Sequence, residues 1–143
     1  MKSVLVMVCV LCVVVSVLAK PQPEPALPLP GIWKVTLTPE EASAKAGEKG
    51  FEETLTFKDG SFRAEGLAAR GFDWVKYKLE DRPEITVFIA EAKSDKDEGT
   101  AKWIGHVNGR RLIVGLTWTK ADGSIVKWNG EGKKIEPAAE GKR

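Results

Sequence analysis

The sequence predicts an all-β protein, an eight-stranded antiparallel up-and-down barrel with one short helix between its first two strands. Short segments with alternating apolar residues recur along the chain, which is typical of strands with one buried face. The dipeptides Asp59-Gly60, Asn108-Gly109 and Asp122-Gly123 favour tight hairpin turns, and hairpins make neighbouring strands antiparallel. Closure into a barrel removes exposed edges, although a two-sheet sandwich stays open until the last strand is shown to pair with the first.

The expected strands follow from this alternation and from the turn residues between them. They cover residues 32–38, 51–58, 61–64, 73–80, 85–92, 100–107, 111–119 and 124–133. Residues 66–71 lie between two of them and favour a turn, which can be helical. The segment 85–92 is apolar on both faces, so we expect it to be covered on both sides.

One connection, residues 39–50, does not have a strand pattern. Thr38 is a candidate N-cap, Pro39 fits the first helical position, Glu41 completes a capping box, and Gly47 can follow the last turn. We therefore expect a helix of about two turns near one mouth of the barrel. Its apolar residues are only Ala42, Ala44 and Ala46. They form no wide apolar stripe, so the helix should dock weakly and be mobile, as a lid would be.

The N-terminal segment 1–19 predicts a secretory signal peptide. Lys2 precedes an apolar run over residues 4–18. This run is shorter than the ~20 residues of a membrane span, which argues against the alternative of an uncleaved anchor helix. Cleavage would remove Cys9 and Cys12, leaving no cysteine and no stable membrane insertion. The expected location is secreted or periplasmic.

The rest of the chain divides into three parts. Residues 20–30 contain five of the eight prolines and favour an extended spacer. Residues 31–136 form the predicted barrel domain, and residues 137–143 form a polar, flexible tail.

Composition argues against several classes of function. A formal charge of +2 provides no strong field for nucleic acid. His106 is the only histidine, and no Gly-x-Ser-x-Gly motif is present, so we expect no catalytic residues and no enzyme activity. With no cysteine after cleavage, we expect no metal site and no cofactor.

The tripeptide Gly31-Ile32-Trp33 opens the first expected strand. Together with the eight-strand pattern and the long first connection, it resembles the lipocalins and the wider calycin group. That resemblance implies that Trp33 closes the bottom of the barrel. It also implies that a basic residue of the last strand, Lys133 or Lys134, packs over the indole.

The expected function is binding of a small apolar ligand by a monomeric, non-catalytic barrel, since such barrels combine an apolar lining with an open mouth. The candidate ligand-binding residues share inward positions on the expected strands: Trp33, Leu37, Phe57, Tyr77, Val87, Trp103, Leu116, Trp118 and Trp128. The alternative is a surface module without a cavity that binds protein or polysaccharide through Trp74, Lys76 and Lys78. A barrel filled by its own aromatic side chains favours the alternative.

Overall fold

The computed structural model describes residues 28–135. The predicted signal peptide, most of the spacer and the tail lie outside the described residues. None of the helices in the described part of the chain is long and apolar enough to cross a membrane.

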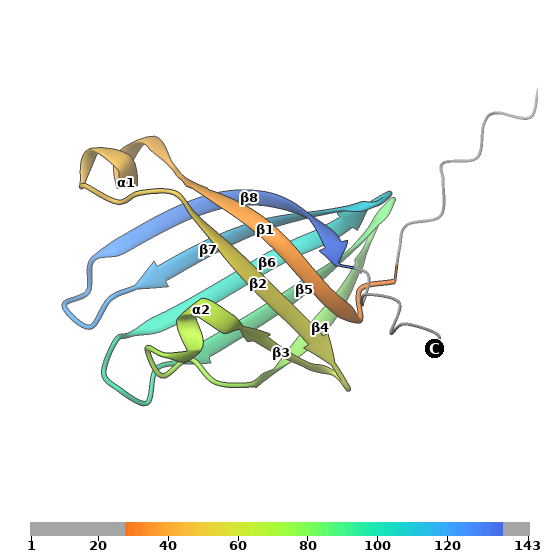
Figure 1. Cartoon of the computed structure of the whole chain (residues 1–143), viewed down its shortest axis with the longest axis horizontal. Coiled ribbons are helices and arrows are strands. Elements are labelled where there is room, and N and C mark those ends of the chain that lie inside the picture. The colour runs from red at the N-terminus through yellow and green to blue at the C-terminus, as the bar shows by residue number, and fades with distance from the viewer. Residues whose placement is uncertain (1–27, 136–143) are drawn as a thin grey trace, which may run out of the picture.

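The eight strands form a closed antiparallel barrel in sequence order, which confirms the predicted fold class (Figure 1). Their bounds are β1 Gly31–Pro39, β2 Phe51–Lys58, β3 Ser61–Ala64, β4 Val75–Arg82, β5 Ile85–Lys93, β6 Thr100–Asn108, β7 Arg111–Thr119 and β8 Ile125–Ile135. β8 pairs with β1 over eight residue pairs, from Ile32↔Ile135 to Pro39↔Trp128. This pairing closes the barrel and excludes the sandwich.

The short helix α1, Glu41–Lys45, lies between β1 and β2 as expected, but its predicted start was wrong. Pro39 is the last residue of β1, where it pairs with Trp128, and Glu40 is the N-cap without a side-chain capping bond. Strand pairing therefore continues through the position assigned to the first helical turn. Gly47, with φ +96°, does follow the helix, as predicted.

Contacts of α1 with the barrel are polar. Its buried residue is Ser43, whose hydroxyl accepts a hydrogen bond from the Lys127 N–H at 2.8 Å. Its two alanines, Ala42 and Ala44, and the C-cap residue Ala46 are exposed, as expected for a helix without an apolar face. A second helical turn, α2 Glu65–Ala68, follows β3 within the segment predicted as a turn.

One of the predicted hairpin turns is confirmed, and another is wrong by one residue. Asp59 and Gly60 both have positive φ, 51° and 75°, as a type I′ turn requires. Asn108, by contrast, pairs with Arg111, so the β6–β7 turn is Gly109-Arg110, with positive φ only at Gly109. Strand pairing continues one residue further than the Asn-Gly dipeptide indicated.

The middle of the barrel is filled by side chains. The largest fully buried residues are Trp33, Trp103, Phe57, Phe62, Phe88, Leu37, Leu55, Leu112, Leu116 and Val35. The Phe57 ring lies 5.0 Å from Phe62 and 4.8 Å from Phe88, and Phe62 lies 5.5 Å from Trp103, measured between centroids. An eight-stranded barrel is just wide enough for such a packed interior.

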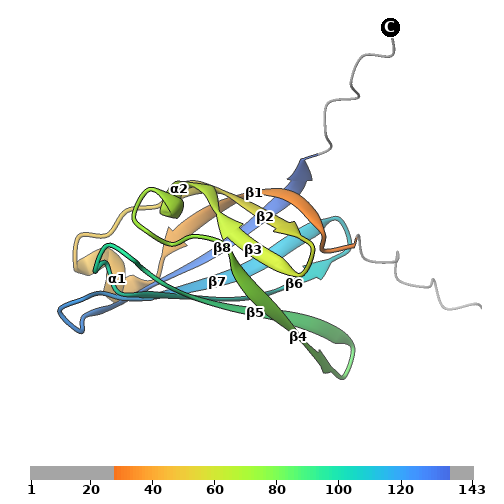
Figure 2. The ribbon, with the colours of Figure 1, turned by 90° about the horizontal axis from the view of Figure 1, so that it is seen from below.

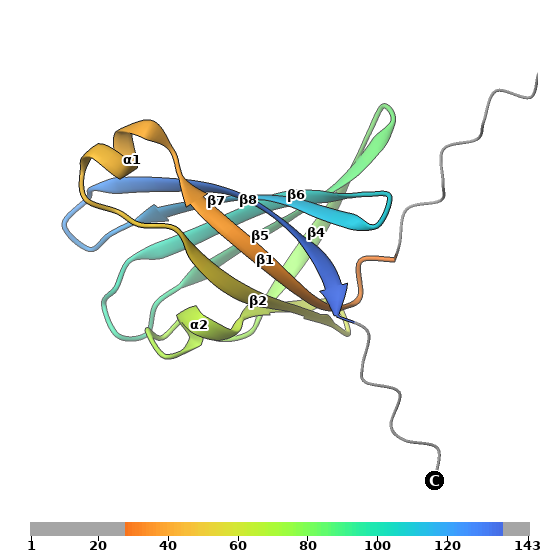
Figure 3. The same cartoon turned by 45° about the horizontal axis from the view of Figure 1, so that its top comes forward.

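The β4–β5 hairpin projects from the end of the barrel where β1 begins and β8 ends (Figures 2 and 3). β3 pairs with β4 at only two positions, Ser61↔Lys76 and Phe62↔Val75, whereas β4 pairs with β5 at six. The turn between them is Pro83-Glu84, with φ +75° at Glu84, which fits a type II turn. The twist of that turn does not match twisted strands, which favours a splayed hairpin.

Candidate functional site

Trp33 closes the bottom of the barrel, as the resemblance implied. Its indole Nε1 donates to the Leu29 carbonyl at 2.8 Å. The Lys134 ammonium lies 5.6 Å from the ring centroid and donates to the Pro28 carbonyl at 2.9 Å. Of the two lysines proposed for this place, Lys134 therefore occupies it.

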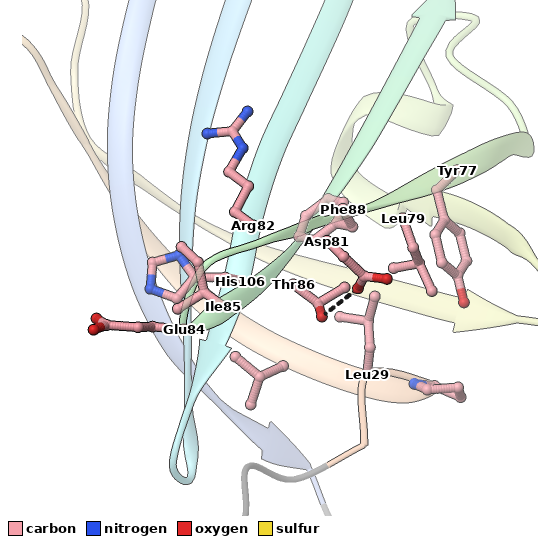
Figure 4. Close-up of a pocket in the computed structure, with 12 residues that line it drawn as sticks. Leu29, Tyr77, Leu79, Asp81, Arg82, Glu84, Ile85, Thr86, Phe88 and His106 are labelled. Carbon is pink, nitrogen blue, oxygen red and sulfur yellow. Dashed lines mark hydrogen bonds between the residues drawn. The ribbon is translucent and has the colours of Figure 1, made fainter.

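A cavity of about 650 Å³ lies beside this floor, and we call it the terminal cavity. It is bounded by the projecting β4–β5 hairpin, by the segment before β1 and by the end of β6 (Figure 4). Its apolar lining comprises Leu29, Pro30, Tyr77, Leu79, Ile85, Phe88 and Val107. Pockets for drug-sized ligands span about 300–1,000 Å³, so the volume suits one small molecule.

Leu79 shows that this cavity is open. Its side chain lies on the inward face of β4, the same face as that of Tyr77, yet 61% of Leu79 is exposed. An inward position is exposed here because β3 begins only at Ser61, opposite Lys76, and so does not cover this part of β4. Large apolar side chains exposed next to a hollow are typical of binding surfaces.

The polar groups of the terminal cavity come from the hairpin and from β6. The Thr86 hydroxyl donates to the Asp81 carboxylate at 2.9 Å, and Leu29 points toward this pair in Figure 4. Arg82 also lines the cavity, and its Nε lies 3.1 Å from the Glu80 carboxylate. Glu84 and His106 complete the polar lining.

A second cavity of about 360 Å³ lies at the opposite end of the barrel, and we call it the helix-end cavity. Trp118 and Trp128 line it, with ring centroids 6.4 Å apart. The Arg70 guanidinium lies 5.0 Å from the Trp118 centroid, and the Lys120 ammonium lies 5.7 Å from it. The faces of this indole are therefore already in contact with cations of the protein itself.

Glu53 is a buried carboxylate at the edge of the helix-end cavity. It is 3% exposed and accepts hydrogen bonds from the Gly66 N–H at 2.6 Å and the Thr54 N–H at 2.9 Å. Burial raises the pKa of Glu53 above its usual 4.5, and the negative charge of Glu65 adds to this, while the two hydrogen bonds oppose it. Because Gly66 lies in the first turn of α2, the carboxylate caps this helix in place of an N-cap side chain.

A third feature is an exposed surface strip formed by Arg63, Trp74, Lys76 and Lys78. Trp74 is 42% exposed, as its predicted outward orientation requires, and the Arg63 guanidinium lies 5.9 Å from its ring centroid. The Arg63 Nε is buried and has no hydrogen-bond partner among the described residues. The strip thus combines an aromatic surface with positive charge.

The structure separates the nine predicted ligand-binding residues into four groups. Only Tyr77 lines the terminal cavity, while Trp118 and Trp128 line the helix-end cavity. Five belong to the packed interior: Trp33, Leu37, Phe57, Trp103 and Leu116.

Val87 forms the fourth group, and its predicted inward orientation was wrong. It pairs with Glu80 and His106 and is buried outside the core cluster, whereas its neighbour Phe88 packs within that cluster. Because both faces of this segment are apolar, alternation alone left the inward face undetermined.

Two residues of the candidate sites were not predicted, although the sequence contains a signal for each. Leu79 shares its alternation with Tyr77, which marks an inward residue near the end of a strand. Glu53 shares its alternation with Phe51 and Leu55, so the pattern indicated a carboxylate on the buried face. Within residues 28–135, no three His, Cys, Asp or Glu residues lie close enough together to hold a metal ion.

Comparison of the chain with models of protein families, with curated proteins and with solved structures finds no match.

Proposed function

We propose that this protein binds a small apolar molecule in the terminal cavity, at the end of the barrel rather than inside it. The observation that carries the proposal is the conjunction of a 650 Å³ hollow with an inward-facing Leu79 that is 61% exposed. The packed interior leaves the ends of the barrel as the place for a ligand. The protein acts as a secreted or periplasmic, non-catalytic carrier or sensor, and the lipocalin-like floor at Trp33 supports this class.

The test is titration with N-phenyl-1-naphthylamine, a neutral probe that fluoresces in apolar surroundings, with fatty acids as competitors. Wild type should bind the probe in a saturable way. Leu79→Glu should weaken binding by at least tenfold, because the new carboxylate would lose water against the bound probe.

Ile125→Glu is the matched control, since Ile125 is 59% exposed and lies on β8 near the opposite end of the barrel. It should bind the probe like wild type. Equal binding by wild type and Leu79→Glu, or no binding by wild type, would contradict the proposal.

A second candidate function rests on the exposed strip, and the interior filled by aromatic side chains, which is the outcome expected for a surface module, favours it. Trp74, with the Arg63 guanidinium beside it and Lys76 and Lys78 on the same face of the chain, suits an anionic polysaccharide. Retention of the protein on cell-wall polysaccharide should then be lost in Trp74→Ala and kept in Leu79→Glu. Retention that is unchanged in Trp74→Ala would exclude this function.

A further inference from the structure

The projecting part of β4 has one edge without a partner strand among the described residues. β3 covers only Val75 and Lys76, and the last hydrogen bond on this side runs from the Tyr77 N–H to the Gly60 carbonyl at 3.2 Å. Beyond it, residues 78–82 pair only with β5. An unpaired strand edge is a template for a further strand.

The register identifies the free backbone groups. Arg82 and Ile85 flank a two-residue turn and form its closing pair, so residues 78, 80 and 82 direct their backbone groups toward β5. Backbone direction alternates along an antiparallel strand, so the N–H and C=O of Leu79 and Asp81 point to the open side, as those of Tyr77 do. The edge therefore offers two donors and two acceptors.

These same two residues line the terminal cavity with their side chains. We infer that the terminal cavity also accepts the apolar side chain of an extended peptide, which adds to β4 antiparallel to it, along the line that β3 would have followed. This inference rests on the proposed function, because the apolar lining that would hold the small molecule would hold that side chain. Main-chain hydrogen bonds would give affinity, and the cavity would take alternate side chains.

The lining specifies the two inward-pointing side chains of the peptide. The residue opposite Leu79 would be apolar, because it enters the apolar part of the cavity. The residue opposite Asp81 would be basic, because the one arginine of the cavity, Arg82, is already paired with Glu80, whereas no described salt bridge includes Asp81 or Glu84. Since the peptide runs antiparallel to β4, its sequence from the N-terminus is a basic residue, then any residue, then an apolar residue.

A second copy of this chain fits the edge poorly. The register that uses the free edge 78–82 on both copies places Glu80 opposite Glu80 and Lys78 opposite Arg82. Like charges directly opposite each other destabilise strand pairs. The charges thus disfavour self-pairing, and the partner is a different peptide.

The experiment uses the fluorescein-labelled pentapeptide Thr-Arg-Thr-Leu-Thr, blocked at its C-terminus, and measures anisotropy with wild-type protein. N-methylation of the leucine nitrogen removes a donor that faces β4 and should weaken binding about tenfold. N-methylation of the central threonine, whose N–H faces away, is the matched control and should change binding by less than about twofold. Asp81→Asn should weaken binding of this peptide several-fold but leave a peptide with glutamine in place of arginine unchanged.

The outcomes separate this inference from the proposed function. If wild type does not bind N-phenyl-1-naphthylamine, the proposed function fails. If the probe binds in a manner that depends on Leu79, but the peptide does not displace it, or both methylated peptides bind equally, the inference is overturned and the proposed function stands.

Discussion

The two ends of the barrel differ in how their connections are held. At the helix end, two indoles from the core donate to the loops above them, Trp118 to the Glu98 carbonyl at 2.6 Å and Trp128 to the Lys49 carbonyl at 3.1 Å. At the terminal end, Trp33 holds only the segment before β1 in this way, while the β4–β5 hairpin extends past its neighbours. Trp118 is accordingly 6% exposed, whereas Leu79 is 61% exposed.

This difference shows where a filled barrel still has room for a ligand. Because the interior is packed, an opening is found where one strand extends beyond the strand that pairs with it. β3 has four residues and β4 has eight, and the larger cavity lies beside the uncovered part of β4. Unequal strand lengths, rather than barrel width, create the candidate site.

Removal of the floor of the terminal end should have the largest effect. Trp33→Ala should lower the free energy of unfolding by about 3–5 kcal/mol, because a fully buried indole is replaced by a methyl group and leaves a cavity. Urea denaturation measures this. The matched control is Trp74→Ala, which should cost less than about 1 kcal/mol because Trp74 is 42% exposed. Equal losses for the two variants would show that the floor does not stabilise the barrel.

At the helix end, Glu53 should make stability depend on pH. Burial raises the pKa of this carboxyl in the folded state, so the stability that it contributes is present below its unfolded pKa and lost as pH rises through the folded pKa. The free energy of unfolding of wild type should therefore fall relative to that of Glu53→Gln as pH rises above 4.5, the usual pKa of this carboxyl. The glutamine retains an oxygen that can accept from the Gly66 N–H.

Glu52→Gln is the control for this pH dependence, because Glu52 is the exposed neighbour and pairs with Lys34 at 3.4 Å. It should not show the relative gain in stability at neutral pH. A gain of the same size in both variants would mean that general surface charge, not the buried carboxylate, causes the effect.

Lys134→Met should have a smaller effect at the terminal end. The thioether keeps an apolar side chain over Trp33 but removes the ammonium, which lies 5.6 Å from the ring centroid. We expect a loss of about 0.5–1 kcal/mol by thermal or urea denaturation. Lys133→Met, on the other face of β8, should be close to neutral, and a larger loss there would contradict the role given to Lys134.

The smallest expected effect is local opening of α1 at the helix end. Its alanines are exposed and its contact with β8 runs through Ser43, so its amides should exchange faster than those of β7. Hydrogen exchange measures this directly. Protection of residues 41–46 equal to that of β7 would show a packed structural element and remove the idea of a mobile lid.

Much of the fold was predictable from the sequence, because alternation and turn chemistry act over a few residues. All eight strands lie within two residues of their expected bounds, with β4 and β8 displaced the most. The inward orientation of Trp33, Trp103, Trp118 and Trp128 followed from the same alternation. The place of Lys134 over Trp33 followed from the resemblance instead.

The location of the candidate site follows from the tertiary structure and could not be predicted from the sequence. The sequence shows which residues are apolar and which positions alternate, but not how far each strand is covered by its neighbours. That coverage depends on pairing between segments distant along the chain, and it left Leu79 exposed. For the same reason Val87, in a segment that is apolar on both faces, could not be assigned to the inside or the outside until its partners Glu80 and His106 were known.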